Sequence, residues 1–304
     1  MRPGTVSALK KRGLIRVGIF GRFRAGPGTF ACYSFLKELP QKSFDFILVT
    51  TKSFDSKSAA YDIKRHRFLF TERTKIVLCQ NGWGNAETFS KLFPKKQICN
   101  ARIITGFIRP KLNTVKITVH ADRILIGSPF QKNTGDLPGL CSAINKGGIP
   151  CSISADIEKD LWAKMLYNCA LNPLGAIFDV PYGILGDCPL TRNLMEEIFR
   201  EVFCVMKKAG FKTHWKAPKV YSKIFYAKLL PSTAKHRSSM LQDIQAKKTT
   251  EIEALNGLVI RLADKYKIPV PVNRAVYHAI KFIEEENLKQ QKNGKTPSFP
   301  LTPT

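Results

Sequence analysis

The sequence predicts an α/β protein in two parts: a mainly parallel sheet in the amino-terminal half, followed by an all-α region. Short, near-continuous apolar runs in the first half are separated by turns and a helical segment. After Gly147-Gly148, the apolar residues change to helical spacing. The 304 residues are 44% hydrophobic and 24% charged, which excludes a disordered or fibrous chain and allows a sizeable core.

The expected strands of the first half are residues 16–20, 44–51, 75–80 and 97–104. The run 44–51 (FDFILVTT) is typical of a parallel strand buried on both faces, and a helix is expected within 53–70. Residues 116–126 alternate as in a more exposed hairpin, and the glycine cluster at 21–28 is interpreted as a turn. A strand, a helix and a strand at this spacing predict an open parallel sheet.

The second half carries three apolar stripes with helical periodicity, beginning at Leu194, Ile252 and Val276. We therefore place a domain boundary near residue 155. The predicted division is a sheet domain over 1–155, a helical domain over 156–288 and a disordered tail over 289–304, because that tail is rich in Lys, Gln and Pro.

The composition limits the partners and the compartment. Lys and Arg number 49 against 23 Asp and Glu, a net charge of +26 that would attract polyanions. A basic protein binding nucleic acid or anionic surfaces is therefore the non-enzyme alternative, although no nucleic-acid motif accompanies the charge and no specific nucleic acid is expected. The eight cysteines form no Cys-x-x-Cys pair, so we expect reduced thiols and no metal.

No apolar run is long enough for a membrane span, so no membrane partner is expected. The first 37 residues lack Asp and Glu, as mitochondrial transit peptides do, but they contain few serines and an expected strand. We favour a cytoplasmic location over a mitochondrial one.

The strongest chemical pattern lies in residues 156–177. If this segment is helical, Lys164, Asn168 and Asn172 share one face at i, i+4 and i+8. Polar groups in so apolar a segment need partners, which indicates a lined pocket. The alternative is that Lys164 is solvated and the asparagines cap a helix that ends before Pro173.

A second cluster occupies residues 236–257. Ser239 and Gln242 match a helix capping box, and so do Thr250 and Glu253. The alternative is that Ser239 merely caps a helix. Likewise, Glu251 would merely place a negative charge in the first turn of a helix, where the helix dipole stabilises it.

Taken together, the two clusters resemble the ketopantoate reductase (2-dehydropantoate 2-reductase) family. The shared motifs are Leu161-Trp-x-Lys164-x-x-x-Asn168-x-x-x-Asn172-Pro-Leu, Ser238-Ser239-Met-Leu-Gln-Asp243 and Thr250-Glu251-Ile-Glu-x-Leu-Asn256-Gly257. Upstream, Leu48-Val-Thr-Thr-Lys52, Gln80-Asn81-Gly82-x-Gly84-Asn85 and the 115–127 hairpin agree. The resemblance runs from about residue 2 to residue 287, and it implies a Rossmann-like NADP-binding sheet domain before a helical catalytic domain.

The resemblance implies an enzyme of pantothenate biosynthesis that transfers a hydride from NADPH to the C2 ketone of 2-dehydropantoate, giving D-pantoate. The carried-over catalytic residues are Lys164, as general acid, and Glu251. The carried-over substrate residues are Asn168, Asn172 and Ser239. The carried-over cofactor residues are Lys52, Asn81, Gly106 and Arg2. A small 2-oxo acid is the expected partner, and the protein would be a monomer or a homodimer.

Two departures from the family pattern leave alternatives open. Tyr182 stands where the family often has Asn in a Pro-Asn-Gly turn, which allows a reductase of another 2-oxo acid. The strand, Gly-x-Gly-x-x-Gly turn and helix that open the family fold are missing from these residues, so the sheet domain is expected to be incomplete at its start. Three explanations fit this departure: an incomplete gene model or short isoform, a pseudoenzyme that no longer binds NADPH, and a partner that supplies the missing strands. We favour the first.

Overall fold

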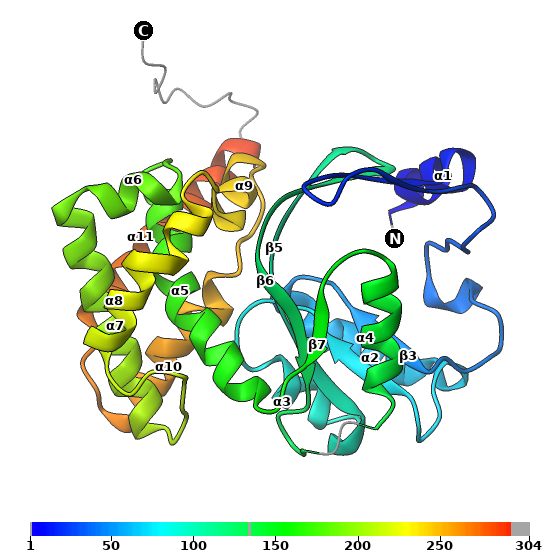
Figure 1. The fold of residues 1–304 in the computed structure, drawn as a ribbon, viewed down its shortest axis with the longest axis horizontal. Coiled ribbons are helices and arrows are strands. Elements are labelled where there is room, and N and C mark those ends of the chain that lie inside the picture. Colours follow the sequence, from blue (N-terminus) through cyan, green and yellow to red (C-terminus); the bar gives the residue numbers. More distant parts are fainter. Residues whose placement is uncertain (1, 133–134, 293–304) are drawn as a thin grey trace, which may run out of the picture.

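The computed structural model describes residues 2–132 and 135–292, and it has a sheet region beside a bundle of helices (Figure 1). The strands are β1 (Leu14–Gly18), β2 (Phe23–Ala25), β3 (Phe46–Val49), β4 (Lys75–Leu78), β5 (Ile98–Lys111), β6 (Thr114–Gly127) and β7 (Cys151–Ile153). The helices of the sheet region are α1 (Pro3–Arg12), α2 (Ser56–Arg65), α3 (Asn85–Ser90) and α4 (Leu137–Lys146). The bundle contains α5 (Ile157–Ile177), α6 (Tyr182–Asp187), α7 (Pro189–Lys208), α8 (Pro218–Ile224), α9 (Ser239–Gln245), α10 (Asn256–Tyr266) and α11 (Pro271–Lys292).

Short helical turns connect these elements. They are η1 (Leu36–Glu38), η2 (Ser53–Asp55), η3 (Arg67–Leu69), η4 (Lys95–Gln97), η5 (Phe225–Leu229), η6 (Pro231–Thr233) and η7 (Ile252–Ala254). The expected α/β class, with a sheet first and helices after it, is confirmed.

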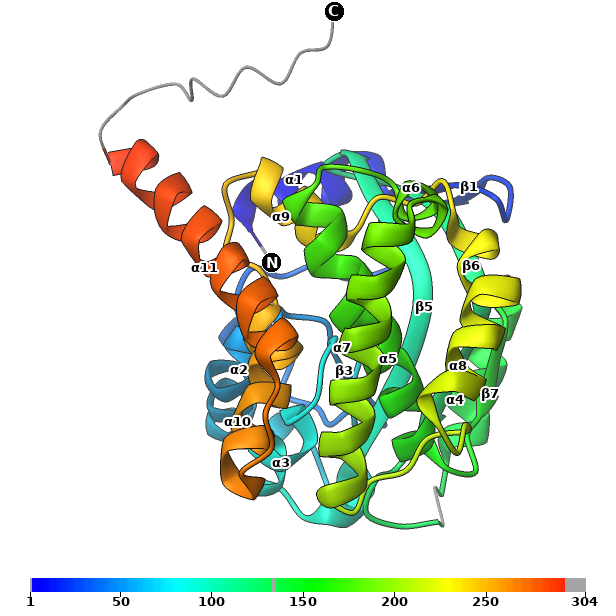
Figure 2. The same ribbon diagram turned by 90° about the vertical axis from the view of Figure 1, so that its left-hand side faces the viewer.

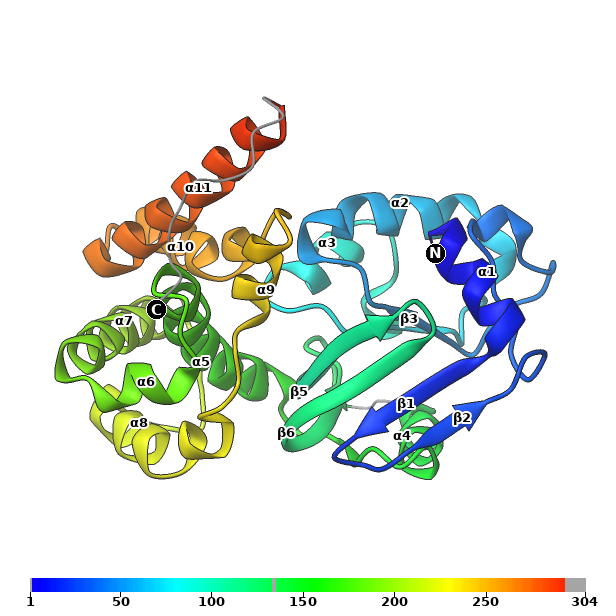
Figure 3. The ribbon, with the colours of Figure 1, turned by 90° about the horizontal axis from the view of Figure 1, so that it is seen from above.

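The seven strands form one mixed sheet in the order β2-β1-β6-β5-β4-β3, with β7 also paired to β6. Neighbours β3, β4 and β5 are parallel, whereas β5 and β6 are antiparallel. Residues 97–104 and 116–126 were expected to be a separate strand and a separate hairpin. Instead they belong to two 14-residue strands of one long hairpin, which Figure 3 shows beside the helical bundle. The turn expected at 21–28 includes the short strand β2, which pairs with β1.

Strand β3 lies at an edge of the sheet, and only part of it is buried, which corrects the expectation that residues 44–51 are buried on both faces. β3 pairs with β4 on one side, and within residues 2–132 and 135–292 no strand pairs with its other side. The side chain of Leu48, which projects from one face of the strand, is 46% exposed. An apolar run therefore correctly predicted the strand but not its place in the sheet.

Helices cover both faces of the parallel strands. On one face, α2 and α3 pack Ala60, Ile63 and Phe89 against Ile76 and Leu78 of β4. On the other face, Leu137 and Leu140 of α4 pack with Val77, and this layer also includes Cys141 and Cys151. The alternating apolar residues of the strands supply both cores.

The bundle shares one larger core built around α5, which lies alongside β5 (Figure 2). Helix α5 continues through Pro173 to Ile177, so Asn172 does not cap a helix that ends there. Proline has no N–H for the carbonyl four residues earlier, that of Cys169. The side-chain Nδ2 of Asn256 donates to that carbonyl at 3.0 Å, which makes an internal proline tolerable.

The structure also bears on three further expectations about the helices. Ser238, not Ser239, caps α9, because its Oγ accepts from the Leu241 N–H. Glu251 makes no side-chain cap of η7. Helix α11 extends to Lys292, four residues into the predicted tail, and the rest of that tail lies outside the described residues. Among the helices that the structure describes, none combines the length and apolar character that crossing a bilayer requires.

Candidate active site

A cavity of about 220 Å³ lies between strand β5 and the helices α5 and α9. Six of the predicted site residues line it: Asn81, Gly106, Lys164, Asn168, Asn172 and Ser239. They come from four separate segments of the chain, so the fold brings together the two clusters found in the sequence and adds the turn after β4.

Lys164 lies at the inner end of this cavity. Its ammonium donates to Asn81 Oδ1 and to the carbonyl oxygen of Ile103, each at 2.6 Å. Two short bonds fix the Nζ atom, and the cavity lies beside it. The position is suitable for an acid that donates a proton to a bound small molecule.

Burial lowers the pKa of Lys164 to about 8. The nearby carboxylate of Glu251 opposes this shift, and the positive charge of Arg102 adds to it. An amine with a pKa near neutrality can both hold and release a proton, which is the property that a general acid needs.

Glu251 reaches Lys164 indirectly, through Asn81. The Asn81 Nδ2 donates to Glu251 Oε2 at 2.9 Å, while the other carboxylate oxygen accepts from the backbone N–H of Ser53 at 3.0 Å. The carboxamide of Asn81 is therefore held at both ends, with its oxygen toward the ammonium and its nitrogen toward the carboxylate. Glu251 is only 6% exposed, so these partners are needed to stabilise its charge.

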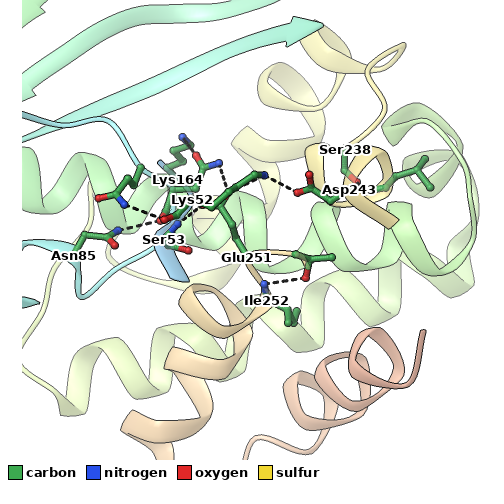
Figure 4. A network of polar contacts seen from close by, with 12 residues as sticks. Lys52, Ser53, Asn85, Lys164, Ser238, Asp243, Glu251 and Ile252 are labelled. Carbon is green, nitrogen blue, oxygen red and sulfur yellow. Dashed lines mark hydrogen bonds and ion pairs between the residues drawn. The ribbon is translucent and has the colours of Figure 1, made fainter. Parts of the chain in front are cut away.

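Lys52 joins the same network from the sheet side. Its ammonium contacts Asp243 Oδ2 of α9 at 2.6 Å and lies 3.7 Å from Glu251 Oε2. Figure 4 shows the network, with Asp243 on one side of Lys52, Asn85 on the other, and Lys164 close to Lys52 in this view. The ion pairs connect the loop after β3 to the helical bundle.

The turn that carries Asn81 is shaped by glycine. Gly82 has a φ of +81°, which L side chains rarely adopt. A Cβ at this position would lie 2.4 Å from the carbonyl oxygen of Ala254 in η7. The Trp83 N–H donates to the same carbonyl at 3.1 Å, so the turn packs directly against the segment that follows Glu251.

The predicted substrate residues present polar groups to the cavity. Asn168 and Asn172 are 7% and 5% exposed, and Ser239 is half-buried at the first turn of α9. In the described part of the chain, the Asn168 side chain and the Ser239 hydroxyl have no hydrogen-bond partner, and both line the cavity. Ser238 performs the capping instead, which leaves Ser239 available to a ligand.

Of the predicted cofactor residues, Gly106 lines the cavity, whereas Arg2 lies outside it. Gly106 of β5 lines the cavity, where an added Cβ would be 2.9 Å from His236 Cε1, so a side chain would close this space. Arg2 is exposed at the start of α1, and no hydrogen bond or ion pair links it to Lys164 or Glu251 among the described residues.

The sequence did not single out several residues that complete the site. Asp243 was only part of a motif, and the carbonyl of Ile103 and the N–H of Ser53 carry no side-chain signal at all. Tyr182 was noticed only as a departure, yet its hydroxyl donates to Asn172 Oδ1 at 2.7 Å. Among the residues that the structure describes, no group of three or more His, Cys, Asp or Glu side chains could hold a metal ion.

Two family models match the chain. "Ketopantoate reductase PanE/ApbA" matches residues 2–129, and "Ketopantoate reductase PanE/ApbA C terminal" matches residues 156–284. A 2-dehydropantoate 2-reductase of Aquifex aeolicus is 38% identical over 273 residues, which is 90% of this chain and 86% of the relative. The chain belongs to the ketopantoate reductase family. The family prediction is confirmed, and with it the prediction of an oxidoreductase.

Solved structures agree on the fold. A PanE/ApbA family ketopantoate reductase from Ralstonia eutropha has a TM-score of 0.79 at 26% identity, covering 94% of this chain and 90% of its own. A 2-dehydropantoate 2-reductase from Geobacter metallireducens has a TM-score of 0.82 at 23% identity, with 93% and 90% covered. The second match, below 25% identity, carries the fold alone.

A second, larger cleft borders the free edge of β3. Its volume is about 1220 Å³, and its lining includes β3, the loop around Phe35 and residues along the length of α2. The cleft adjoins Thr51, next to the Lys52 that joins the polar network.

Proposed function

We propose that this member of the ketopantoate reductase family reduces 2-dehydropantoate to D-pantoate, using NADPH. The observation that carries the proposal is a cavity lined by the Lys164 ammonium and the Asn81 carboxamide, which hydrogen-bonds the buried carboxylate of Glu251 behind it. Relatives that carry the name 2-dehydropantoate 2-reductase support the choice of substrate. In this proposal residues 1–155 serve the cofactor and residues 156–288 serve catalysis.

Lys164 acts as the general acid. Its ammonium hydrogen-bonds the ketone oxygen of the substrate and gives up one proton to the oxygen as negative charge develops there. Glu251 keeps Asn81 oriented and stabilises the positive charge of Lys164 before the proton leaves. Asn168, Asn172 and Ser239 bind the oxygen atoms at the other end of the substrate.

The cofactor, when bound, supplies the hydride. The residues present fit its reacting end, because Asn81 places a carboxamide in the wall of the cavity beside Lys164. Lys52 would bind the phosphate at the adenosine end of the cofactor only after its ion pair with Asp243 is broken. The 304 residues contain no Gly-x-Gly-x-x-Gly turn for the pyrophosphate.

The test is turnover of a panel of 2-oxo acids with NADPH by the full chain, followed as loss of nicotinamide absorbance. We expect the highest kcat/KM for 2-dehydropantoate. Equal rates for all members of the panel would favour the second candidate, a reductase of a different 2-oxo acid, which is suggested by Tyr182 at the cavity wall.

The third candidate is a pseudoenzyme that no longer binds NADPH. One observation favours it: the ammonium of Lys52 is engaged by the carboxylates of Asp243 and Glu251. Fluorescence quenching tests whether the chain binds NADPH. Salt-sensitive retention on heparin measures polyanion binding in parallel. Retention without quenching would reject the reductase proposal.

A further inference from the structure

Tyr182 forms part of the cavity wall, yet its hydroxyl does not point to a ligand. It lies at the start of α6, is 3% exposed, and donates to Asn172 Oδ1 at 2.7 Å. The backbone fixes it on both sides, since the Tyr182 N–H donates to the carbonyl of His236 and the Gly183 N–H donates to that of Ala234.

The bond to Tyr182 orients the carboxamide of Asn172. Burial raises the pKa of Tyr182 well above its ordinary value, so the phenol keeps its proton and needs an acceptor. In the opposite orientation of the carboxamide, the phenol would face Nδ2, and its proton would have no acceptor among the described residues. The observed orientation is therefore the stable one.

The bond to Tyr182 holds Oδ1 on the phenol side and leaves the Nδ2 donor of Asn172 without a protein partner among the described residues. No group in the described part of the chain accepts from this nitrogen, and Asn172 lines the cavity. A donor presented in this way binds an oxygen acceptor, either a carboxylate oxygen or a hydroxyl oxygen of a small molecule.

We propose that Tyr182 is a positioning residue for substrate specificity, which holds Asn172 so that Nδ2 donates to an oxygen atom of the 2-oxo acid. The inference rests on the proposed reductase function. It gives the phenol a role through Asn172, in place of the direct substrate contact suggested by its position in the Pro-x-Gly turn.

The experiment is a double-mutant cycle on the full chain with Tyr182→Phe and Asn172→Ala. We expect Tyr182→Phe to raise KM for 2-dehydropantoate by about tenfold with kcat within about twofold, because a binding contact is lost equally in ground and transition states. In the Asn172→Ala background, Tyr182→Phe should have no further effect. Tyr221→Phe is the matched control, since it removes a buried hydroxyl of the same core for which the described residues offer no hydrogen-bond partner.

Two substrates show which substrate oxygen accepts the hydrogen bond from Asn172 Nδ2. If Asn172 binds the terminal hydroxyl, Tyr182→Phe should affect 2-dehydropantoate more than 3,3-dimethyl-2-oxobutanoate, which lacks that hydroxyl. If it binds the carboxylate, both substrates should lose affinity equally. Either result supports the inference, whereas an unchanged KM for both, or additive effects of the two substitutions, would overturn it.

Failure of the reductase function is recognised separately. If the wild-type chain turns over no 2-oxo acid, the same four chains are compared by calorimetry. The quantity measured is then the dissociation constant of oxamate, an unreactive mimic of a 2-oxo acid. Oxamate binding weakened about tenfold by Tyr182→Phe would keep the inference while the proposed function fails. Absence of oxamate binding to the wild-type chain would overturn both.

Discussion

At the scale of single residues, Asn81 organises the site. Its side-chain oxygen accepts from Lys164 and its nitrogen donates to Glu251, while its backbone carbonyl accepts from Asn85 Nδ2 at 3.1 Å. Neither Lys164 nor Glu251 contacts the other directly. A neutral carboxamide between them keeps the ammonium near a carboxylate without a direct ion pair, so the lysine keeps a pKa close to neutrality.

Removing the Lys164 ammonium tests its assignment as the acid. We expect Lys164→Ala to lower kcat by about 10²- to 10⁴-fold, because proton donation by a positioned side chain contributes about that factor. Its circular dichroism spectrum should match that of the wild type. Lys223→Ala, which removes an exposed lysine of α8, is the control and should keep full activity. Unchanged turnover of Lys164→Ala would contradict the assignment.

The pKa of about 8 predicts a pH profile. The acid must be protonated, so kcat/KM should be constant below this value and fall as the pH rises through it. Lys164→Arg provides the contrast, because a guanidinium stays protonated throughout the range. Its residual rate should not decline between pH 7 and about 10. The same decline in both enzymes would assign the titration to another group.

At the scale of elements, helix α5 depends on a residue far along the chain. Pro173 removes one helical N–H, and Asn256 at the start of α10 supplies the missing donor to Cys169. The same Asn256 Nδ2 also donates to Asn273 Oδ1 at 2.9 Å. Helices α5, α10 and α11 are thus tied together at the point where α5 carries Asn172 to the cavity.

Asn256→Ala should therefore destabilise the bundle. The carbonyl of Cys169 would be left buried without a donor, at a cost of about 1–3 kcal/mol in the free energy of unfolding. Urea denaturation followed by tryptophan fluorescence measures this loss, because Trp162 lies in the same core. Asn193→Ala on the exposed side of α7 is the matched control. Equal unfolding midpoints for the two variants would show that Pro173 needs no such compensation.

At the scale of the whole molecule, β3 forms a free edge of the sheet within the described residues. Leu48 is 46% exposed beside a cleft of about 1220 Å³ with an apolar lining. Unpaired edge strands with exposed apolar side chains favour association with other chains. The net charge of +26 opposes such association through mutual repulsion, more weakly as salt is added.

A charge on the edge strand tests this view. We expect Leu48→Lys to reduce self-association of the chain in 0.5 M salt, measured by light scattering, because a charged side chain disfavours edge-to-edge pairing. Leu190→Lys changes an exposed leucine of α7 and should leave the association as it is. If both substitutions reduce scattering equally, added charge and not the β3 edge is responsible.

Local patterns predicted much of this fold and part of the site. The apolar run at 75–80 became β4, and the segment 156–177 became α5 with Lys164, Asn168 and Asn172 on one face. The expectation that residues 44–51 are buried on both faces was wrong at Leu48, because an apolar run indicates a strand without showing what covers it. The capping pattern at Ser239 was off by one residue, since Ser238 is an equally good cap.

The sequence by itself determined the family, the order of sheet and helices, and the residue types that the chemistry needs. Only the tertiary structure decided that Asn81 links Lys164 to Glu251, that Lys52 pairs with Asp243, and that Tyr182 occupies one end of Asn172. Periodicity and motifs act over a few residues, whereas these contacts join segments that lie far apart in the chain. Their geometry is set by packing, and backbone partners such as Ile103 leave no mark in a sequence.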